Sequence, residues 1–393
     1  MKVVELRNVF TSCNDTLIEI KDDFIYYAEE KKEEGHNNLF ILEYNRDTKR
    51  ERILSNYFLK STNYIKHFFS FQGEILIIME SGESEVTVLS IDKHTGEEKN
   101  TAKLSFIGNM SQCCALDRSH LIIYTEQNEK HRSQFEEYEK LTGRDKIVYL
   151  FDLNDGAYYY LCDPRFSGED GARFITYDKD GESQLLVLQP HKTEEDKAKA
   201  YEDRRWVGDN VNDNVWVCSL SAFIDSVKLG EECAPLELVL CAGTCGMVRY
   251  VGMNEKQIYF RAKYFPTNDQ RLCSYNIHTG KKSVVTELNL EEDKEKLSQF
   301  YIDVNSSKAY SITTEVDEDY QVDGVWNSSV HSIYSRELGD FVACIDDRYI
   351  IARYVLSDDK DSFEFNSIYD IATGEQKSYE CKCLVKGDTV VLY

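Results

Sequence analysis

The stretch from 341 to 393 decides the fold, because it contains the pattern that the rest of the chain repeats. Two apolar runs, Phe341-Val-Ala-Cys-Ile345 and Tyr349-Ile-Ile-Ala-Arg-Tyr-Val355, flank the polar turn Asp346-Asp347-Arg348. A run of alternating apolar and polar residues follows from 363 to 371, and a Thr-Gly turn leads into a last short run from 376 to 381. Four strand-sized runs separated by turn residues predict one four-stranded antiparallel sheet.

The same pattern recurs along the whole chain. The second run of each unit is rich in aromatic and β-branched residues, and these runs centre on Tyr26, Ile77, Ile123, Leu186, Tyr259, Tyr310, Ile350 and Val391. Successive centres lie 51, 46, 63, 73, 51, 40 and 41 residues apart. The short spacings match the roughly 40–50 residues of a propeller blade. The two long spacings predict insertions.

Two turn signatures mark these units. The turn before the second run carries Asp, Asn or Gly, as in Gln72-Gly73, Asp117-Arg118-Ser119 and Asp178-Lys179-Asp180-Gly181. The turn after the third run follows an apolar or aromatic residue and begins with Asp or Asn, as at Asn45, Asp92, Asp152, Asn276 and Asp370. Such side chains hydrogen-bond the turn backbone, and Gly tolerates a positive φ. His94 and His278 fall inside this second turn and are expected to be exposed turn residues.

This recurrence resembles the blades of bacterial β-propellers with loosely WD40-like repeats. The resemblance covers essentially the whole chain and implies an all-β, single-domain fold over residues 1–393, built from four-stranded antiparallel blades. Seven complete units run from about Thr16 to Glu380, and a half unit follows from Cys381 to Tyr393. Pairing of the N-terminal run, Lys2 to Phe10, with this half unit would close the ring as an eighth blade. Seven blades are the alternative.

The insertions predict where the molecule binds. They fall between the second and third strands, at 29–38, 126–145, 189–213, 263–270 and 315–328, so all are expected on one face. Helices are expected near 131–141 and 194–206. Because elaborated loops on a rigid scaffold often bind partners, their aromatic residues are the candidate binding residues: Phe135, Tyr138, Tyr201, Trp206, Tyr264, Phe265, Tyr320 and Trp326. The alternative is that these rings pack beneath solvated loops.

Charge and composition limit the classes of molecule that the chain is expected to bind. Lys and Arg number 46 against 70 Asp and Glu, a net charge of −24 that would repel nucleic acid and anionic membranes. No apolar run approaches the roughly 20 residues of a membrane helix, and the first residues do not resemble a signal peptide. We therefore expect a cytoplasmic monomer whose partner is a protein or peptide, with a basic one suiting the charge.

Chemistry-bearing motifs are sparse. The 12 cysteines include no Cys-x-x-Cys pair, which favours reduced structural thiols over a metal site. Two acidic runs, 315–319 and 209–214, have oxygen ligands suited to Ca²⁺ but lack EF-hand spacing. Nucleophile, phosphate-loop and zinc-protease motifs are absent from the sequence. We expect no metal and no cofactor.

These features favour a non-catalytic propeller scaffold that binds a protein or peptide through the face carrying the acidic and aromatic insertions. The alternative is a carbohydrate-binding or carbohydrate-active propeller of the lyase or hydrolase type. Its site would lie at the central channel, where carboxylates and aromatic rings would meet. The resemblance itself implies a shape and little chemistry, because propellers include scaffolds, lyases, lactonases and hydrolases.

Overall fold

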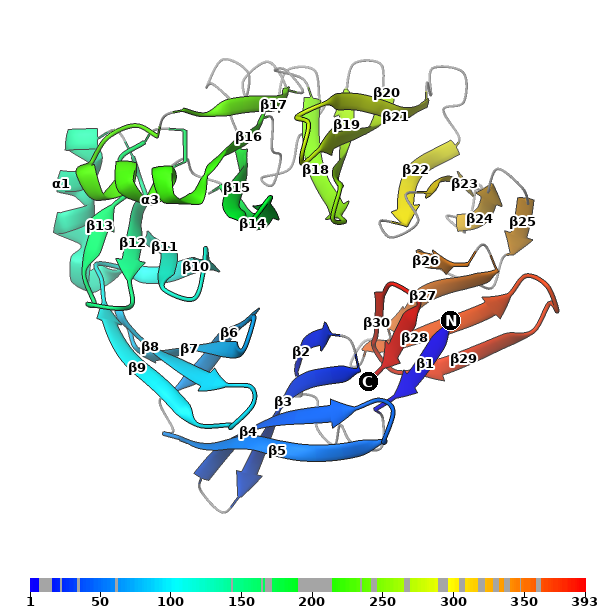
Figure 1. Cartoon of the computed structure of the whole chain (residues 1–393), viewed down its shortest axis with the longest axis horizontal. Helices are drawn as coiled ribbons and strands as arrows, with labels where there is room; N and C mark the ends of the chain where they lie inside the picture. The colour runs from blue at the N-terminus through cyan, green and yellow to red at the C-terminus, as the bar shows by residue number, and fades with distance from the viewer. Residues whose placement is uncertain are drawn as a thin grey trace. The chain divides into compact units, whose positions relative to one another are not determined.

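The computed structural model describes residues 1–6, 16–21, 23–33, 36–60, 63–142, 144–163, 165–166, 172–189, 214–233, 235–241, 246–264, 269–288, 296–303, 308–316, 322–327, 332–335, 340–346, 348–357 and 362–393. These residues form seven four-stranded antiparallel sheets and one three-stranded sheet (Figure 1). They fall into two compact units, one of residues 16–189 and 214–241, the other of residues 1–6 and 246–393. The all-β class and the four-stranded sheets were predicted and are confirmed.

The 16–241 unit contains four sheets, each made of strands that follow one another in the chain. The first is β2 (Thr16–Lys21), β3 (Phe24–Glu33), β4 (His36–Asn45) and β5 (Arg50–Leu59); the second is β6 (Tyr64–Phe71), β7 (Glu74–Gly82), β8 (Glu85–Asp92) and β9 (Glu98–Ser105). The third is β10 (Asn109–Ala115), β11 (His120–Glu126), β12 (Ile147–Asp152) and β13 (Tyr158–Tyr160); the fourth is β14 (Arg173–Lys179), β15 (Glu182–Gln189), β16 (Asn214–Ser219) and β17 (Glu237–Cys241).

The 246–393 unit repeats this plan. Its sheets are β18 (Gly246–Met253), β19 (Gln257–Tyr264), β20 (Asp269–Asn276) and β21 (Lys282–Leu288); then β22 (Lys296–Asp303), β23 (Lys308–Val316), β24 (Val322–Asn327) and β25 (Ser332–Ser335); then β26 (Asp340–Ile345), β27 (Tyr349–Ser357), β28 (Ser362–Asp370) and β29 (Gln376–Glu380). The last sheet is the one predicted from the stretch that begins at Phe341.

The two chain ends share the three-stranded sheet. Strand β31 (Thr389–Leu392) pairs antiparallel with β30 (Cys383–Lys386) and in parallel with β1 (Lys2–Glu5), which places Val3 opposite Val390 (Figure 1). The predicted pairing of the N-terminal strand with the C-terminal half unit is therefore confirmed. The sheet differs from the predicted blade because it has three strands and one parallel pair; residues 7–10 of the predicted strand lie outside the described residues.

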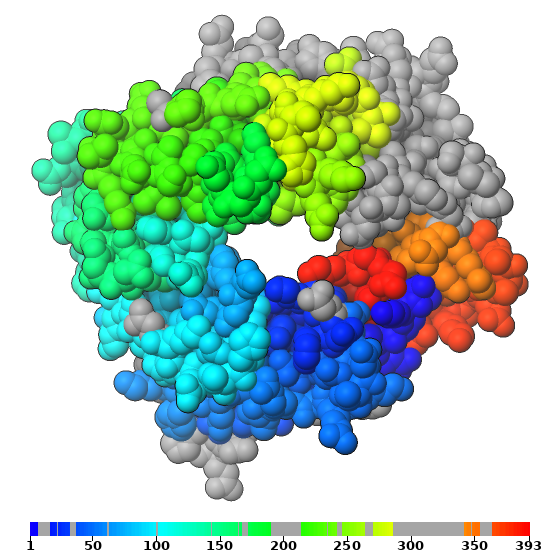
Figure 2. Space-filling view, viewed as in Figure 1, coloured from blue at the N-terminus to red at the C-terminus, as the bar shows by residue number. Residues whose placement is uncertain are grey.

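Burial on both faces explains why consecutive sheets stack. In β7, alternate residues Ile75, Ile77 and Met79 pack in the core shared with the first sheet. Leu76 and Ile78 pack in the core shared with the third sheet. A strand's side chains alternate between its two faces, so an apolar run without polar alternation needs a neighbour on each side. In Figure 2 the segments of this unit follow one another in chain order, from blue through cyan to green.

The predicted turn chemistry is present. Asp92 Oδ1 accepts hydrogen bonds from the backbone N–H groups of His94 (2.7 Å) and Thr95 (2.9 Å). Gly96 closes this turn at φ +75°, and a Cβ there would lie 1.9 Å from the carbonyl oxygen of Leu54. The same bond to the turn backbone is made by Asn45, Asp152, Asn276 and Asp370.

The helices agree with the sequence in one place and differ in another. The insertion at 126–145 contains the 3₁₀ turn η1 (Glu129–His131) and α1 (Arg132–Thr142), near the expected helix. The second expected helix, 194–206, lies outside the described residues.

The expected insertion at 29–38 is wrong, because its described residues extend the β3–β4 ladder. In the described parts of the chain, no helix is long and apolar enough to cross a bilayer.

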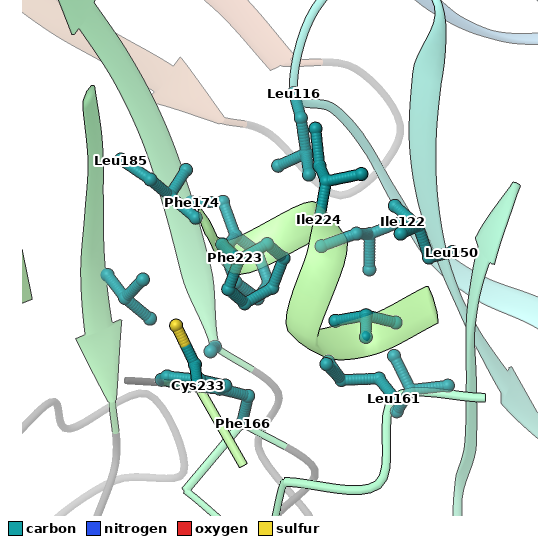
Figure 3. Close-up of a cluster of buried hydrophobic side chains, with 14 of the residues drawn as sticks. Leu116, Ile122, Leu150, Leu161, Phe166, Phe174, Leu185, Phe223, Ile224 and Cys233 are labelled. Atoms are coloured by element: carbon teal, nitrogen blue, oxygen red, sulfur yellow. The ribbon is translucent and has the colours of Figure 1, made fainter. Parts of the chain in front are cut away.

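Helix α3 (Leu220–Leu229) was not predicted. It is capped by Ser219 and ends at Gly230 with φ +71°. Its buried face includes Phe223 and Ile224, which pack into the core between the third and fourth sheets (Figure 3). The Phe223 ring lies 5.6 Å from that of Phe166, edge to face. The helix therefore fixes the fourth sheet to the third.

The shared sheet predicts an asymmetry between the two chain ends. Leu392 is fully buried, whereas Val3 is 39% exposed. Leu392→Ala should lower the free energy of unfolding by about 2–5 kcal/mol, and Val3→Ala should change it by no more than about 0.5 kcal/mol. Urea denaturation of both variants measures the difference. Equal effects would show that β31 is not part of the cooperative core.

Candidate functional site

Of the eight residues predicted to bind, the structure describes the side chains of two, Phe135 and Tyr138. Phe135 is 2% exposed and packs in the core between the second and third sheets, with Tyr138 half-buried against the same core. Tyr264 ends β19 and Trp326 lies in β24, but their side chains are outside the description. The others lie outside the described residues: Tyr201, Trp206, Phe265 and Tyr320. Phe135 thus anchors α1 from beneath, and binding by the remaining rings stays a prediction.

A polar pocket of about 230 Å³ lies between the second and third sheets. Its lining residues come from both sheets and are Glu74, Leu76, Val88, Ser90, Lys99, Ala102, Arg118, Ser119, Leu153 and Asn154. Strand β11 begins beside the pocket, at His120, and ends at Glu126, where the α1 insertion starts. The pocket therefore lies among the short turns, at the strand ends opposite to this insertion. We call it the seam pocket.

One wall of the seam pocket is an ion-pair network. Lys99 Nζ lies 2.9 Å from Glu74 Oε1 and 2.9 Å from Asp92 Oδ2. Hydrogen bonds to Asp92 and Glu74 raise the pKa of Lys99. The hydrogen bond from Lys99 and those from the turn backbone lower the pKa of Asp92. Lys99 therefore stays charged at neutral pH and is a poor proton acceptor.

The opposite wall presents Arg118, Ser119 and Asn154. Arg118 is exposed, and its guanidinium makes no ion pair with another described residue. Ser119 follows it in the same turn, and Asn154 comes from the turn after β12. A cation, a hydroxyl and an amide facing Glu74 and Lys99 are groups that recognise a small ligand with carboxylate and hydroxyl substituents.

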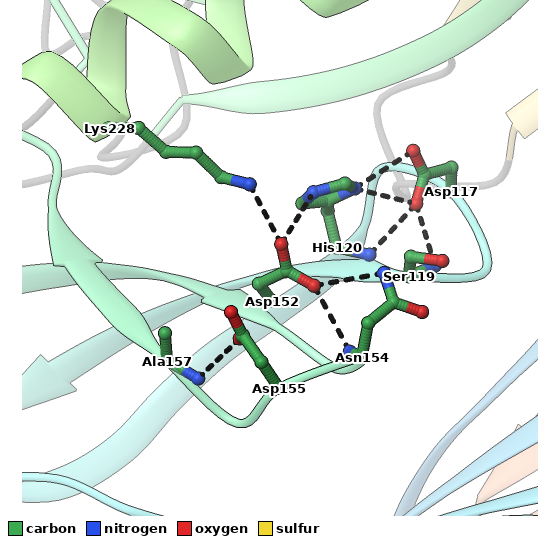
Figure 4. Close-up of polar contacts among 8 residues, drawn as sticks. All are labelled: Asp117, Ser119, His120, Asp152, Asn154, Asp155, Ala157 and Lys228. Carbon is green, nitrogen blue, oxygen red and sulfur yellow. Dashed lines mark hydrogen bonds and ion pairs between the residues drawn. The ribbon is translucent and has the colours of Figure 1, made fainter.

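A second network lies behind this wall and holds its two turns (Figure 4). Asp117 accepts hydrogen bonds from the backbone N–H groups of Ser119 (2.7 Å) and His120 (2.8 Å), and the His120 ring nitrogen Nδ1 lies 3.0 Å from the same carboxylate. Lys228, in the last turn of α3, donates to Asp152 Oδ2 over 2.7 Å. His120 Nε2 lies 3.6 Å from that oxygen.

Each charged group in this second network favours the charged form of its partner. The hydrogen bond to Asp117 raises the pKa of His120, and the carboxylate of Asp152 adds to this effect. Burial opposes ionisation of Asp117 and Asp152, but hydrogen bonds from His120 and Lys228, respectively, and from the turn backbones hold both pKa values below the ordinary range. We infer a positioning role for this network: it orients the turns that carry Arg118 and Asn154.

Sequence reasoning identified the turn at 117–119 and Asp152 as turn chemistry, not as parts of a site. The available signal was His120, which lies three residues after Asp117 and therefore on the same turn. The contribution of Lys228 had no sequence signal, because it depends on the docking of α3.

No family model and no curated protein matches the sequence. Among solved structures, a prolyl endopeptidase has a TM-score of 0.50 and 10% identity, covering 93% of this chain and 49% of its own. The β-propeller domain of the Trilobed protease from Pyrococcus furiosus has a TM-score of 0.42 and 12% identity, covering 93% and 97%. A polysaccharide lyase, an ulvan lyase, has a TM-score of 0.43 and 9% identity, covering 81% and 83%. The chain thus spans about half the length of the prolyl endopeptidase.

These comparisons give the fold: the chain is similar to β-propeller proteins, as the repeats predicted. They also correct the functional expectation. The activities named for the similar structures are mostly peptidase, hydrolase and lyase, so the predictions of a non-catalytic scaffold and of a protein that is not an enzyme were wrong.

The network behind the pocket predicts a specific pH dependence of stability. A group whose pKa is raised in the folded protein stabilises below its unfolded pKa, about 6.5 for histidine, and loses that contribution as pH rises through the folded pKa. The stability lost by His120→Asn should therefore be larger at about pH 5.5 than at about pH 8.5. Melting temperatures across this range measure it, with His94→Asn, in an exposed turn, as the control. A loss that does not vary with pH would contradict the assignment.

Proposed function

We propose that the chain is an enzymatic β-propeller that acts on acidic carbohydrate, with the seam pocket as its substrate site. The observation that carries this proposal is the convergence of Glu74, Lys99 and Arg118 on one polar pocket. The seam pocket takes the place of the central channel that the sequence suggested for a carbohydrate site. The similarity to propellers of hydrolases and lyases supports an enzymatic role but does not name the substrate.

The pocket's charge and size favour an acidic sugar. The lining contains the cations Lys99 and Arg118 and the carboxylate Glu74, although the chain carries a net charge of −24. Lys99 is held by Glu74 and Asp92, so Arg118 is the cation that favours a ligand with a carboxylate of its own. The volume, about 230 Å³, lies below the range of about 300–1,000 Å³ of sites for drug-sized ligands and suits one sugar ring.

The lowered pKa of Asp92 favours elimination over hydrolysis. Glycoside hydrolysis uses two carboxyl groups, one of which is a general acid with a raised pKa. Asp92 shares Lys99 with Glu74, but the pKa of Asp92 is lowered, so this carboxyl group does not fit the acid role. A lyase needs one base and a cation that neutralises the sugar carboxylate, and Glu74 and Arg118 fit these roles.

The proposed reaction is a β-elimination. The Glu74 carboxylate takes the proton from the sugar carbon that bears the carboxylate. The electron pair forms a carbon–carbon double bond as the bond to the neighbouring sugar oxygen breaks, and this oxygen takes a proton from water. Arg118 and Lys99 stabilise the negative charge that builds on the sugar carboxylate. The product is an unsaturated acidic sugar, which absorbs ultraviolet light.

We also propose that the sheets form a closed ring of eight blades. Seven four-stranded sheets and the three-stranded sheet that joins both chain ends support this number, with β1 completing the eighth blade. Closure would remove the free edges of the terminal sheets. An experimental structure would contradict this part of the proposal if fewer than eight sheets surrounded one axis or if the ring were open.

Two substitutions test the catalytic assignment. Glu74→Gln and Arg118→Ala should each lower kcat/KM on a uronate polymer by about 10²-fold or more, because one removes the base and the other the charge-stabilising cation. Ultraviolet absorbance of the unsaturated product measures the rate on polygalacturonate, alginate and glucuronate-containing polymers. Arg132→Ala, at the exposed start of α1, is the matched control and should retain full activity. Absence of cleavage of every uronate polymer by the unaltered protein would overturn the proposal.

A further inference from the structure

Three tyrosines form an aromatic cluster on the third sheet, and a fourth lies nearby on α1; the proposed reaction uses none of them. Tyr158 and Tyr160, on β13, point to the same face because they are two residues apart. Their ring centroids lie 5.8 Å apart, and those of Tyr158 and Tyr149 lie 5.6 Å apart. The Tyr160 ring lies 5.3 Å from that of Tyr149. Tyr138, on α1, packs half-buried against the same core. We call Tyr138, Tyr149, Tyr158 and Tyr160 the tyrosine track.

The tyrosine track combines one buried, fixed ring with two exposed rings. Tyr149 is 1% exposed, stacks on Phe151 at 5.6 Å, and accepts a hydrogen bond from the backbone N–H of Ile107 (3.2 Å). Tyr158 and Tyr160 pack against the Tyr149 ring and are 50% and 39% exposed. Their orientation is therefore set before any ligand arrives, which lowers the entropy lost on binding.

The track begins beside the seam pocket. Tyr158 is the partner of Phe151 in the β12–β13 ladder, and Leu153, two residues after Phe151, lines the pocket. Ala102, which also lines the pocket, packs against the same core as Phe151 and Leu153. From Tyr158 the strand leads to Tyr160, away from the turn. Burial and the neighbouring hydroxyls of Tyr158 and Tyr138 raise the pKa of Tyr160, consistent with the track continuing to α1.

From this geometry we infer that the tyrosine track binds the sugar units that follow the one in the seam pocket, so that the substrate is an oligosaccharide chain. This inference rests on the proposed function. Exposed aromatic rings offer flat faces to the C–H surface of a sugar ring, and phenol hydroxyls hydrogen-bond its hydroxyl groups. Two exposed rings are far less than the roughly 800 Å² per partner of a stable protein interface, which favours a sugar chain over a protein.

Chain-length dependence of binding tests this inference. Isothermal titration calorimetry would compare a uronate disaccharide with the corresponding hexasaccharide, using Glu74→Gln protein to prevent cleavage. The hexasaccharide should bind at least tenfold more tightly, and Tyr158→Ala/Tyr160→Ala should abolish this advantage while leaving disaccharide affinity unchanged. Tyr158→Phe/Tyr160→Phe keeps the rings and should retain most of the advantage. Phe58→Ala is the matched control, since Phe58 is 54% exposed on β5, the fourth strand of another sheet.

The outcomes separate the inference from the proposed function. Equal affinity for the two saccharides, or an undiminished advantage in the double alanine variant, would show that the tyrosine track does not bind sugar. Either result would leave the proposed substrate site in the seam pocket unaffected. If neither saccharide binds, both proposals fail. Melting temperatures of the variants show whether a loss of affinity reflects a loss of folding.

Discussion

Burial of the middle strands on both faces is the constraint on which this structure depends. In β12 every residue from Ile147 to Asp152 is buried, and one sheet alone cannot provide that environment. Each sheet must therefore stack on its neighbours, and alternate residues of one strand belong to two different cores. The core of the 16–241 unit is thus a series of seams between sheets rather than one centre.

The seams also explain where polar chemistry gathers. At the strand ends the apolar core stops, and the turns of two neighbouring sheets come together with their Asp, Asn and Ser residues. Between the second and third sheets these turns supply Glu74, Lys99 and Arg118, while Lys228 from α3 and His120 hold the turns from behind. Along the same seam the outer strand presents its tyrosines. Stacking for stability therefore creates a polar pocket and an aromatic surface beside it.

Part of the local structure of this protein was predicted from its sequence, and the meeting of separate turns at the pocket was not. The turn at Asp92 was predictable because an Asp side chain bonds its own turn. Helix α3 was missed although its signals are local: the cap Ser219, the terminal Gly230 and apolar residues at helical spacing. The far end of the β3–β4 ladder is polar, and without apolar alternation its sequence predicts a loop rather than strands. The pocket was beyond prediction, since its residues come from separate turns whose meeting depends on stacking.

The most direct test of the account is a crystal structure of Glu74→Gln protein soaked with a uronate disaccharide. The account predicts a sugar ring in the seam pocket, with its carboxylate oxygens about 2.7–3.2 Å from the Arg118 guanidinium. A disaccharide bound on another face, or a pocket that stays without sugar while the ligand binds in solution, would contradict the central claim that the seam between the second and third sheets is the working site.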